Sequence, residues 1–191
     1  MAGATLEFDS QAVLAAINEA AEAMGNPTPM LENMGEYLLQ RTEDRFASQT
    51  APDGTPWQAL SPRYQRSKKK NRDKILTFNG YLGKHFAYQI NGSELLVGTN
   101  RVYAAIHQFG GELQRQARQS TVYFKQSKKG DIGKRFVKKT ESNFAQDVNI
   151  GAYTIRIPAR PFLGTSAADD DVLLQIAMKY IQPGISGGTA K

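Results

Sequence analysis

Two dense groups of basic side chains are the residues of this sequence whose type and spacing could do chemistry. Between residues 63 and 74 seven cations face one acid, a net charge of +6; they are Arg63, Arg66, Lys68, Lys69, Lys70, Arg72 and Lys74. Between residues 112 and 140 nine cations face two acids, a net charge of +7; they include Lys125, Lys128, Lys129, Lys134, Arg135, Lys138 and Lys139. The whole chain carries only +6. Its basic character therefore belongs to these two segments, which can attract phosphates or carboxylates.

Two interpretations of the basic segments stay open. Dense cations can bind the phosphates of DNA without sequence preference. Aromatic side chains for base stacking are few, namely Tyr64 in the first segment and Tyr123, Phe124 and Phe136 in the second. The sequence therefore favours a solvated loop and arm that a partner protein orders over direct contact with DNA.

Catalytic and metal-binding patterns are missing from the sequence. His85 and His107 have no acidic or histidine partner at ligand spacing, and neither a phosphate-binding loop nor a Gly-x-Ser-x-Gly elbow occurs. We expect a backbone group to satisfy His107. The run Asp169 to Asp171 lacks the alternate spacing of a calcium loop, so it predicts a helix cap. No enzyme activity, cofactor, metal or small-molecule substrate is expected.

Length and composition indicate one globular domain with an elaboration, or at most two small domains. The chain has 191 residues, 40% of them hydrophobic, and no cysteine, so no disulfide framework is expected. No secretory signal and no apolar run of ~18 residues occurs, so neither export nor a membrane contact is expected.

Apolar periodicity and turn residues predict the elements that must position these groups. A helix is expected over 8–24, and a second, amphipathic helix of about twenty residues begins at Thr28, with Thr28 as its cap and the acids Glu32, Glu36, Glu43 and Asp44 on its polar side. We expect this helix to cover a sheet. Residues 51–74 form a long basic loop with a tight turn at Asp53-Gly54, and Trp57 anchors it to the core.

The second half of the chain predicts strands around an insertion. Segments 84–90 and 94–98 flank Asn91-Gly92 as a hairpin, and 102–109 is a short helix with Val102, Ala105, Ile106 and Phe109 on one face before Gly110 and Gly111. Residues 112–151 are an inserted basic arm or hairpin, with strands at 121–125 and 135–138 around a turn at 128–131.

The core is expected to resume after the arm. Residues 153–157 alternate as a strand with one solvated face, and a last helix packs through Val172, Leu173, Ile176 and Met178. The predicted fold is thus α+β: a small antiparallel sheet packed on a long amphipathic helix and shorter helices. Its core domain is 1–111 with 152–183, and 184–191 is a flexible tail.

Four motifs, read in order, resemble a known family. They are Pro52-Asp53-Gly54 with Trp57 and Leu60-Ser61-Pro62, then Ile75-Leu76 with Gly80 and Leu82, then Tyr103 to Gly111, and finally Ile157-Pro158-Ala159-Arg160-Pro161-Phe162-Leu163-Gly164. The series resembles the phage virion morphogenesis family, the tail completion proteins of Mu-like phages and prophages. Arg160, held between two prolines, either braces its turn onto the helix at His107 or contacts another subunit.

The resemblance implies a structural subunit of a tailed phage, assembled in the bacterial host cytoplasm and located in the virion at the neck or the head-proximal end of the tail. It implies a homo-oligomeric ring of six subunits that acts as tail completion or tail terminator protein between a neck or head-completion protein and the tail tube protein. The alternative is a neck or head-closure protein that contacts DNA through the basic loop and arm.

Overall fold

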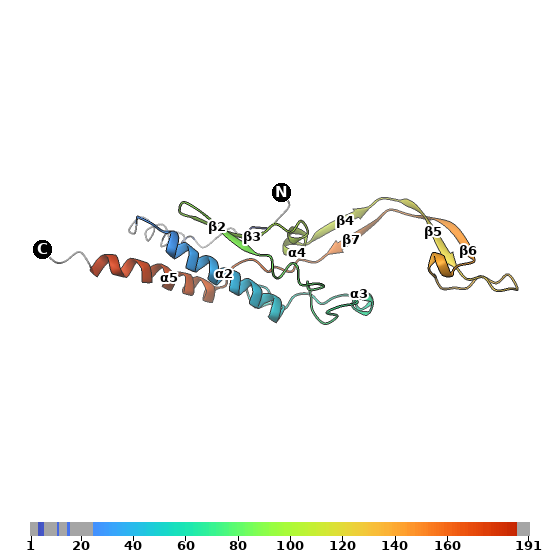
Figure 1. Ribbon diagram of the computed structural model, residues 1–191, viewed down its shortest axis with the longest axis horizontal. Coiled ribbons are helices and arrows are strands. Elements are labelled where there is room, and N and C mark those ends of the chain that lie inside the picture. Colours follow the sequence, from blue (N-terminus) through green and yellow to red (C-terminus); the bar gives the residue numbers. More distant parts are fainter. Residues whose placement is uncertain (1–3, 6–10, 12–14, 16–24, 187–191) are drawn as a thin grey trace. The chain divides into compact units, whose positions relative to one another are not determined.

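The structure, a computed structural model, describes residues 4–5, 11, 15 and 25–186. The helix predicted over 8–24 lies outside these residues except at positions 11 and 15, and residues 187–191 of the predicted tail also lie outside them. The chain divides into two compact units, one of Met1–Gly111 with Pro158–Lys191 and one of Glu112–Ile157. We call the second one the arm unit (Figure 1).

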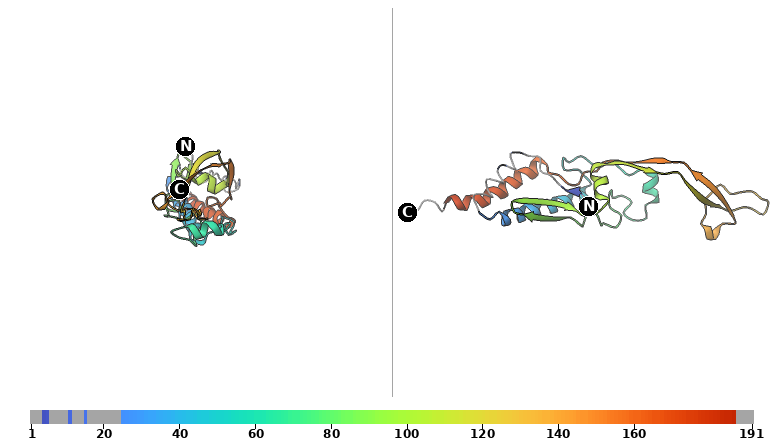
Figure 2. Two further views of the ribbon diagram at one scale, coloured as in Figure 1. Left: turned by 90° about the vertical axis from the view of Figure 1, so that its right-hand side faces the viewer. Right: turned by 90° about the horizontal axis from the view of Figure 1, so that it is seen from above.

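The first unit confirms the α+β expectation. Its sheet has the order β1-β3-β2, with β1 at Ala4–Thr5, β2 at Ala87–Asn91 and β3 at Glu94–Thr99, and both pairs are antiparallel. Helix α2 (Thr28–Ser48) packs on β2 and β3, and α5 (Ala167–Ser186) packs beside α2 (Figures 1 and 2). The predicted cover of a sheet by the long helix is therefore confirmed.

Helix α2 buries one apolar stripe and exposes acids. Met30, Leu31, Met34 and Leu38 are buried together with Val97 of β3 and with Leu173 and Ala177 of α5. At Gly35 a methyl group would lie 2.6 Å from the Tyr88 ring, so only glycine allows this approach of helix and sheet.

The start of α2 corrects one expectation. Thr28 is not the cap: the residue preceding the helix is Pro27, and the Thr28 N–H donates to the side chain of Asn26 over 3.2 Å. An amide two residues earlier can accept from the orphan N–H groups of a first turn as well as a hydroxyl can.

The β2–β3 hairpin is confirmed with a turn displaced by one residue. Asn91 pairs with Glu94, so the loop is Gly92-Ser93 instead of Asn91-Gly92, and Gly92 takes the positive φ of 62°.

The 51–74 loop contains a short helix that the sequence analysis did not predict. Asp53-Gly54 forms the predicted turn, with φ of 81° at Gly54. A short helix, α3 (Pro62–Ser67), then begins after Ser61, whose hydroxyl accepts from the Tyr64 N–H. Its proline at the helix start and its serine cap are typical of a helix N-terminus. The dense cations of the segment instead favoured the prediction of a loop.

Helix α4 (Ala104–Phe109) is present, but its predicted apolar face is wrong. The buried side chains are Ala104 and Gln108, whereas Val102 and Phe109 are 72% and 69% exposed. Gln108 takes the inner position because its amide bonds the 162–163 backbone, as described below. The helix ends at Gly110, with φ of 71°.

The arm unit is built from two strand pairs. β4 (Gly111–Arg115) pairs with β7 (Tyr153–Ile157), and β5 (Arg118–Phe124) pairs antiparallel with β6 (Phe144–Ile150). Residues 135–138 are not a strand, because β6 takes the place beside β5. The segment 153–157 is a strand, but it belongs to the arm unit and is exposed along most of its length.

Helix α5 packs through the predicted Leu173 and Ile176, but not through the predicted Met178. Leu173 and Ala177 are buried, whereas Met178 is 56% exposed. The helical backbone continues to Ser186, two residues beyond the predicted start of the tail. Within the described part of the chain, no helix combines the length and apolarity that a membrane crossing requires.

Candidate interaction surfaces

The described residues hold no group of three or more acidic, histidine or cysteine side chains placed to bind a metal ion. The Nδ1 atom of His85 lies 2.7 Å from the carbonyl oxygen of Tyr81. His107 differs from the expectation: its Nδ1 is buried and has no hydrogen-bond partner among the described residues. Burial, and then the charge of Arg160, lower the pKa of His107. The His107 ring lies edge-on to the ring of Tyr103, with ring centroids 6.3 Å apart.

Side chains from three other segments bond to or pack against the Pro158 to Gly164 motif, which we call the junction. Trp57 donates from Nε1 to the Pro161 carbonyl over 2.7 Å, and it packs edge-on against Phe46 with ring centroids 5.3 Å apart. The predicted anchoring role of Trp57 is therefore confirmed. Phe162 is fully buried in the same cluster.

Gln108 is the residue of this junction that sequence reasoning missed. Its Oε1 accepts from the N–H groups of Phe162 and Leu163 at 2.9 and 3.0 Å, and its Nε2 donates to the Leu163 carbonyl at 2.8 Å. A buried amide that makes three bonds pins two segments 54 positions apart in sequence. The motif Tyr103 to Gly111 included Gln108, but a polar residue beside an apolar stripe gave no sign of burial.

Arg160 braces its turn. Its backbone N–H donates to the His107 carbonyl over 2.7 Å, and its guanidinium donates to the carbonyls of Gln58 and Ala59 at 2.8 and 3.4 Å. The side chain is 7% exposed. Of the two roles considered for Arg160, the structure supports bracing within one chain.

Lys68 also departs from the expected set of contact residues. It is 4% exposed, and its ammonium donates to the carbonyls of Asn71, Lys74 and Thr77. Burial lowers the pKa of the Lys68 ammonium, partly offset by the charge of Asp73. The ammonium organises the loop from inside, so it is not available to a partner. The other six cations of this segment, Arg63, Arg66, Lys69, Lys70, Arg72 and Lys74, are exposed.

The arm unit carries its cations on an ordered end. Its tip, residues 125–139, begins where β5 ends, and the turn at 127–131 is closed by the Ser127 N–H donating to the Asp131 carbonyl over 2.8 Å. All seven tip cations, Lys125, Lys128, Lys129, Lys134, Arg135, Lys138 and Lys139, are exposed. None of the 46 residues from Glu112 to Ile157, all of them described, is buried.

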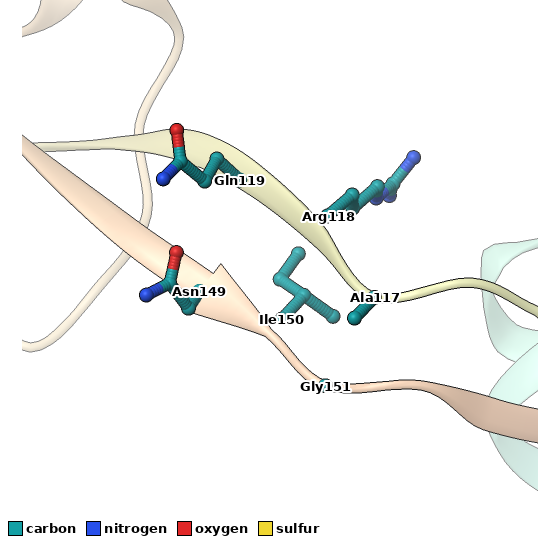
Figure 3. A pocket seen from close by; sticks show the side chains of 6 residues that line it. All are labelled: Ala117, Arg118, Gln119, Asn149, Ile150 and Gly151. Atoms are coloured by element: carbon teal, nitrogen blue, oxygen red, sulfur yellow. The ribbon is translucent and has the colours of Figure 1, made fainter.

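A shallow pocket of about 320 Å³ lies where β5 begins and β6 ends, lined by Ala117, Arg118, Gln119, Asn149, Ile150 and Gly151. Figure 3 shows the paired Gln119 and Asn149 directing their amides to the same side. These side chains offer one cation and two amides but no carboxylate, histidine or hydroxyl. They can bind a polar group, and they supply no pair for acid–base chemistry.

The β4–β7 ribbon exposes an apolar face. Arg156 Nε lies 2.8 Å from Glu112 Oε1, so the even-numbered residues of both strands share one face. The odd-numbered residues Leu113, Tyr153 and Ile155 therefore share the other, and each is more than a third exposed. An exposed apolar face is a candidate surface for contact with another protein.

The model of the phage virion morphogenesis family matches residues 8–182. A curated relative, the putative capsid assembly protein G of Escherichia phage Mu, is 34% identical over 82 residues, which cover 41% of this chain and 53% of the relative. The match thus spans about half of that relative's length. No solved structure matches the chain.

Proposed function

Because the chain belongs to the phage virion morphogenesis family, we propose that it is a non-enzymatic structural subunit that completes the tail of a tailed phage. It forms a ring of six identical subunits at the head-proximal end of the tail, as tail completion or tail terminator protein. A neck or head-completion protein binds above the ring and the tail tube protein binds below it. The family match over 8–182 is the observation that carries this proposal.

The exposed surfaces of the chain support assembly with other proteins. Phe109 at the end of α4, Val102 just before α4, and the odd-numbered face of the β4–β7 ribbon leave apolar area in water that a neighbouring subunit would cover. A closed ring needs two different patches on each subunit, and this chain offers separate patches on its two units. The name of the Mu relative, which refers to capsid assembly, is consistent with a role in building the particle.

Deleting the gene from a phage that encodes this chain tests the proposal. We expect such a phage to make heads and tails that do not join, and to regain joined particles when the protein is supplied. A particle reconstruction should then place the chain in a sixfold ring at the head-proximal end of the tail. Joined, infectious particles without the protein, or a position in the capsid shell, would contradict the proposal.

A neck or head-closure protein that contacts DNA is the second candidate, and the exposed cations of the 51–74 loop and the tip favour it. Phosphate binding weakens steeply as salt rises. Duplex DNA should therefore be retained at 50 mM salt and released near 200 mM, and Lys69→Ala with Lys70→Ala should reduce this retention. DNA binding that is absent at low salt eliminates this candidate, whereas the tail-joining test does not depend on it.

A further inference from the structure

The arm unit is ordered without a core, which raises the question of what its order is for. No residue of Glu112–Ile157 is buried. Two-stranded ribbons are marginally stable in water by themselves. Lysines that attract an acidic partner by charge alone do not need a folded scaffold. The defined conformation of the arm unit therefore indicates that a partner recognises the shape of its surface.

Specific contacts hold the tip in place. The Gln126 N–H donates to the Asn143 side chain over 2.6 Å, and the Asn143 amide donates back to the Gln126 carbonyl over 2.9 Å. Phe136, 74% exposed, packs on Phe124 with ring centroids 5.2 Å apart. The Val137 N–H donates to the Tyr123 carbonyl over 2.9 Å. These contacts hold the backbone that carries the seven tip cations in one folded conformation.

None of those cations takes part in an ion pair among the described residues. The ion pairs found among the described residues involve only Arg41, Arg45 and Arg156 as cations. The arm unit has ten basic and four acidic residues, a net charge of +6. The first unit outside residues 63–74 has seven basic and thirteen acidic residues, a net charge of −6. The chain therefore carries its own complement.

Helix α2 places part of that negative charge in a line. Glu32, Glu36 and Glu43 are exposed, and none of them takes part in an ion pair among the described residues. Positions separated by four and by seven residues lie on the same side of an α-helix. The three carboxylates thus form an acidic stripe roughly 16 Å long, at about 1.5 Å per residue.

We propose that the tip of the arm unit binds the acidic stripe of α2 in a second copy of this chain. Lys125, Lys128 and Lys129 supply the cations that meet the stripe. Tip and stripe are different patches, so each copy donates a tip to one neighbour and accepts a tip from another, as a ring requires. This inference rests on the self-assembly in the proposed function and assigns it a specific contact.

Reversing the charges tests the contact. One variant carries Lys125→Glu, Lys128→Glu and Lys129→Glu, and another carries Glu32→Lys, Glu36→Lys and Glu43→Lys. Each should self-associate at least about tenfold more weakly than the natural chain, as the loss of three exposed ion pairs implies. An equimolar mixture of the two variants should recover the natural association. In that mixture the acidic tip of one variant can bind the basic stripe of the other, and the basic tip of the second can bind the acidic stripe of the first. A matched control, Arg63→Glu with Lys69→Glu and Lys70→Glu, should associate normally.

Circular dichroism and melting temperature must first show that each variant is folded. The mixture supplies a second safeguard, since misfolded chains would not rescue one another. A mixture that associates no better than its components overturns the proposal. So does a tip variant that loses DNA retention while it keeps its self-association, because the cations then serve phosphates.

Cysteine pairing gives an independent measurement on assembled tails. The chain has no cysteine, so a Lys129→Cys population mixed with a Glu36→Cys population can form a mixed disulfide only between two copies. Added to tails that lack the protein, this pair should crosslink, and Ser93→Cys in place of Glu36→Cys should not. Rings without the crosslink overturn the tip-to-stripe contact and leave the proposed function standing. Chains that bind tails without forming rings, or do not bind, overturn both.

Discussion

Asp169 joins the two longest helices at one buried point. Its Oδ2 accepts from Arg45 Nη2 over 2.8 Å, and its Oδ1 accepts from Tyr37 and Arg41 at 2.8 and 3.0 Å. Asp169 and Ser166 also bond reciprocally at the start of α5, so the predicted capping role of the aspartates holds at this position. One carboxylate thus caps a helix and fixes its packing.

Removing Arg45 should destabilise the fold strongly. Its side chain is 6% exposed and also donates to the carbonyls of Phe162 and Gly164, so Arg45→Ala leaves a buried carboxylate and two carbonyls without this donor. We expect a loss of about 3–5 kcal/mol in the free energy of unfolding, measured by urea titration. The control is Arg41→Ala, whose side chain is 43% exposed and should cost less than about 1 kcal/mol. Equal losses for the two variants would refute this account.

Asp169 should also make stability depend on acid. Burial raises its pKa, but the hydrogen bonds from Ser166 and Tyr37 and the charge of Arg45 outweigh burial and bring the pKa to about 2. The unfolded chain, with a pKa near 3.8, binds the proton first, so this contribution is present above about pH 4 and is lost as pH falls toward 2. The contribution amounts to about 2 kcal/mol. Urea titrations at pH 5 and pH 2.5 should show a smaller difference for Asp169→Asn than for the natural chain; an identical difference would contradict the assignment.

At the scale of elements, the 51–74 loop shows how one cation can organise a chain that looks unstructured. Lys68→Ala would leave three carbonyls, of Asn71, Lys74 and Thr77, without their ammonium donor. We expect proteolysis within residues 68–78 to become at least several times faster, because the three carbonyls that converge on the ammonium lose the donor that holds the loop closed. Lys69→Ala removes the same charge from an exposed position and should cleave at the natural rate.

The amide hydrogens of the arm unit should exchange with solvent at different rates in the free and in the assembled protein. Its strands have no buried residue, so the amide hydrogens of β5 and β6 should exchange far faster than those of α2 in the isolated chain. Burial against neighbours should slow that exchange by at least about tenfold in the assembled tail. Mass spectrometry of deuterated peptides measures both states, and unchanged exchange on assembly would show that the arm unit takes no part in contacts.

At the scale of the whole molecule, the arm unit should be dispensable for folding and necessary for assembly. Replacing residues 116–152 with a two-residue turn keeps both clusters of buried residues, since all their members lie in the first unit. The melting temperature should change by less than about 5 °C, the effect of roughly 1 kcal/mol. The shortened chain should fail to join heads to tails in a phage that lacks the natural protein. Normal joining would show that assembly does not need the arm unit.

Much of this fold could be predicted from patterns of residues that lie close together in the sequence. The apolar spacing of α2, the glycine turn between β2 and β3 and the turn at 128–131 depend on residues close in sequence, and each appears in the structure. The family series is likewise local, a succession of short motifs, and the match over 8–182 confirms it. The two concentrations of positive charge are read directly from the order of residues in the sequence.

Long-range pairings required the tertiary structure. Arg45 meets Asp169 across 124 positions, and β5 pairs with β6 and not with residues 135–138. Whether a side chain is buried depends on what lies opposite it, which is why the exposed Phe109 and the buried Gln108 and Lys68 ran against their residue types. The amino-acid sequence by itself determined the family, the helices α2, α4 and α5, and two concentrations of charge. Only the packing of distant segments decided that one lysine is structural and that the arm unit has no core.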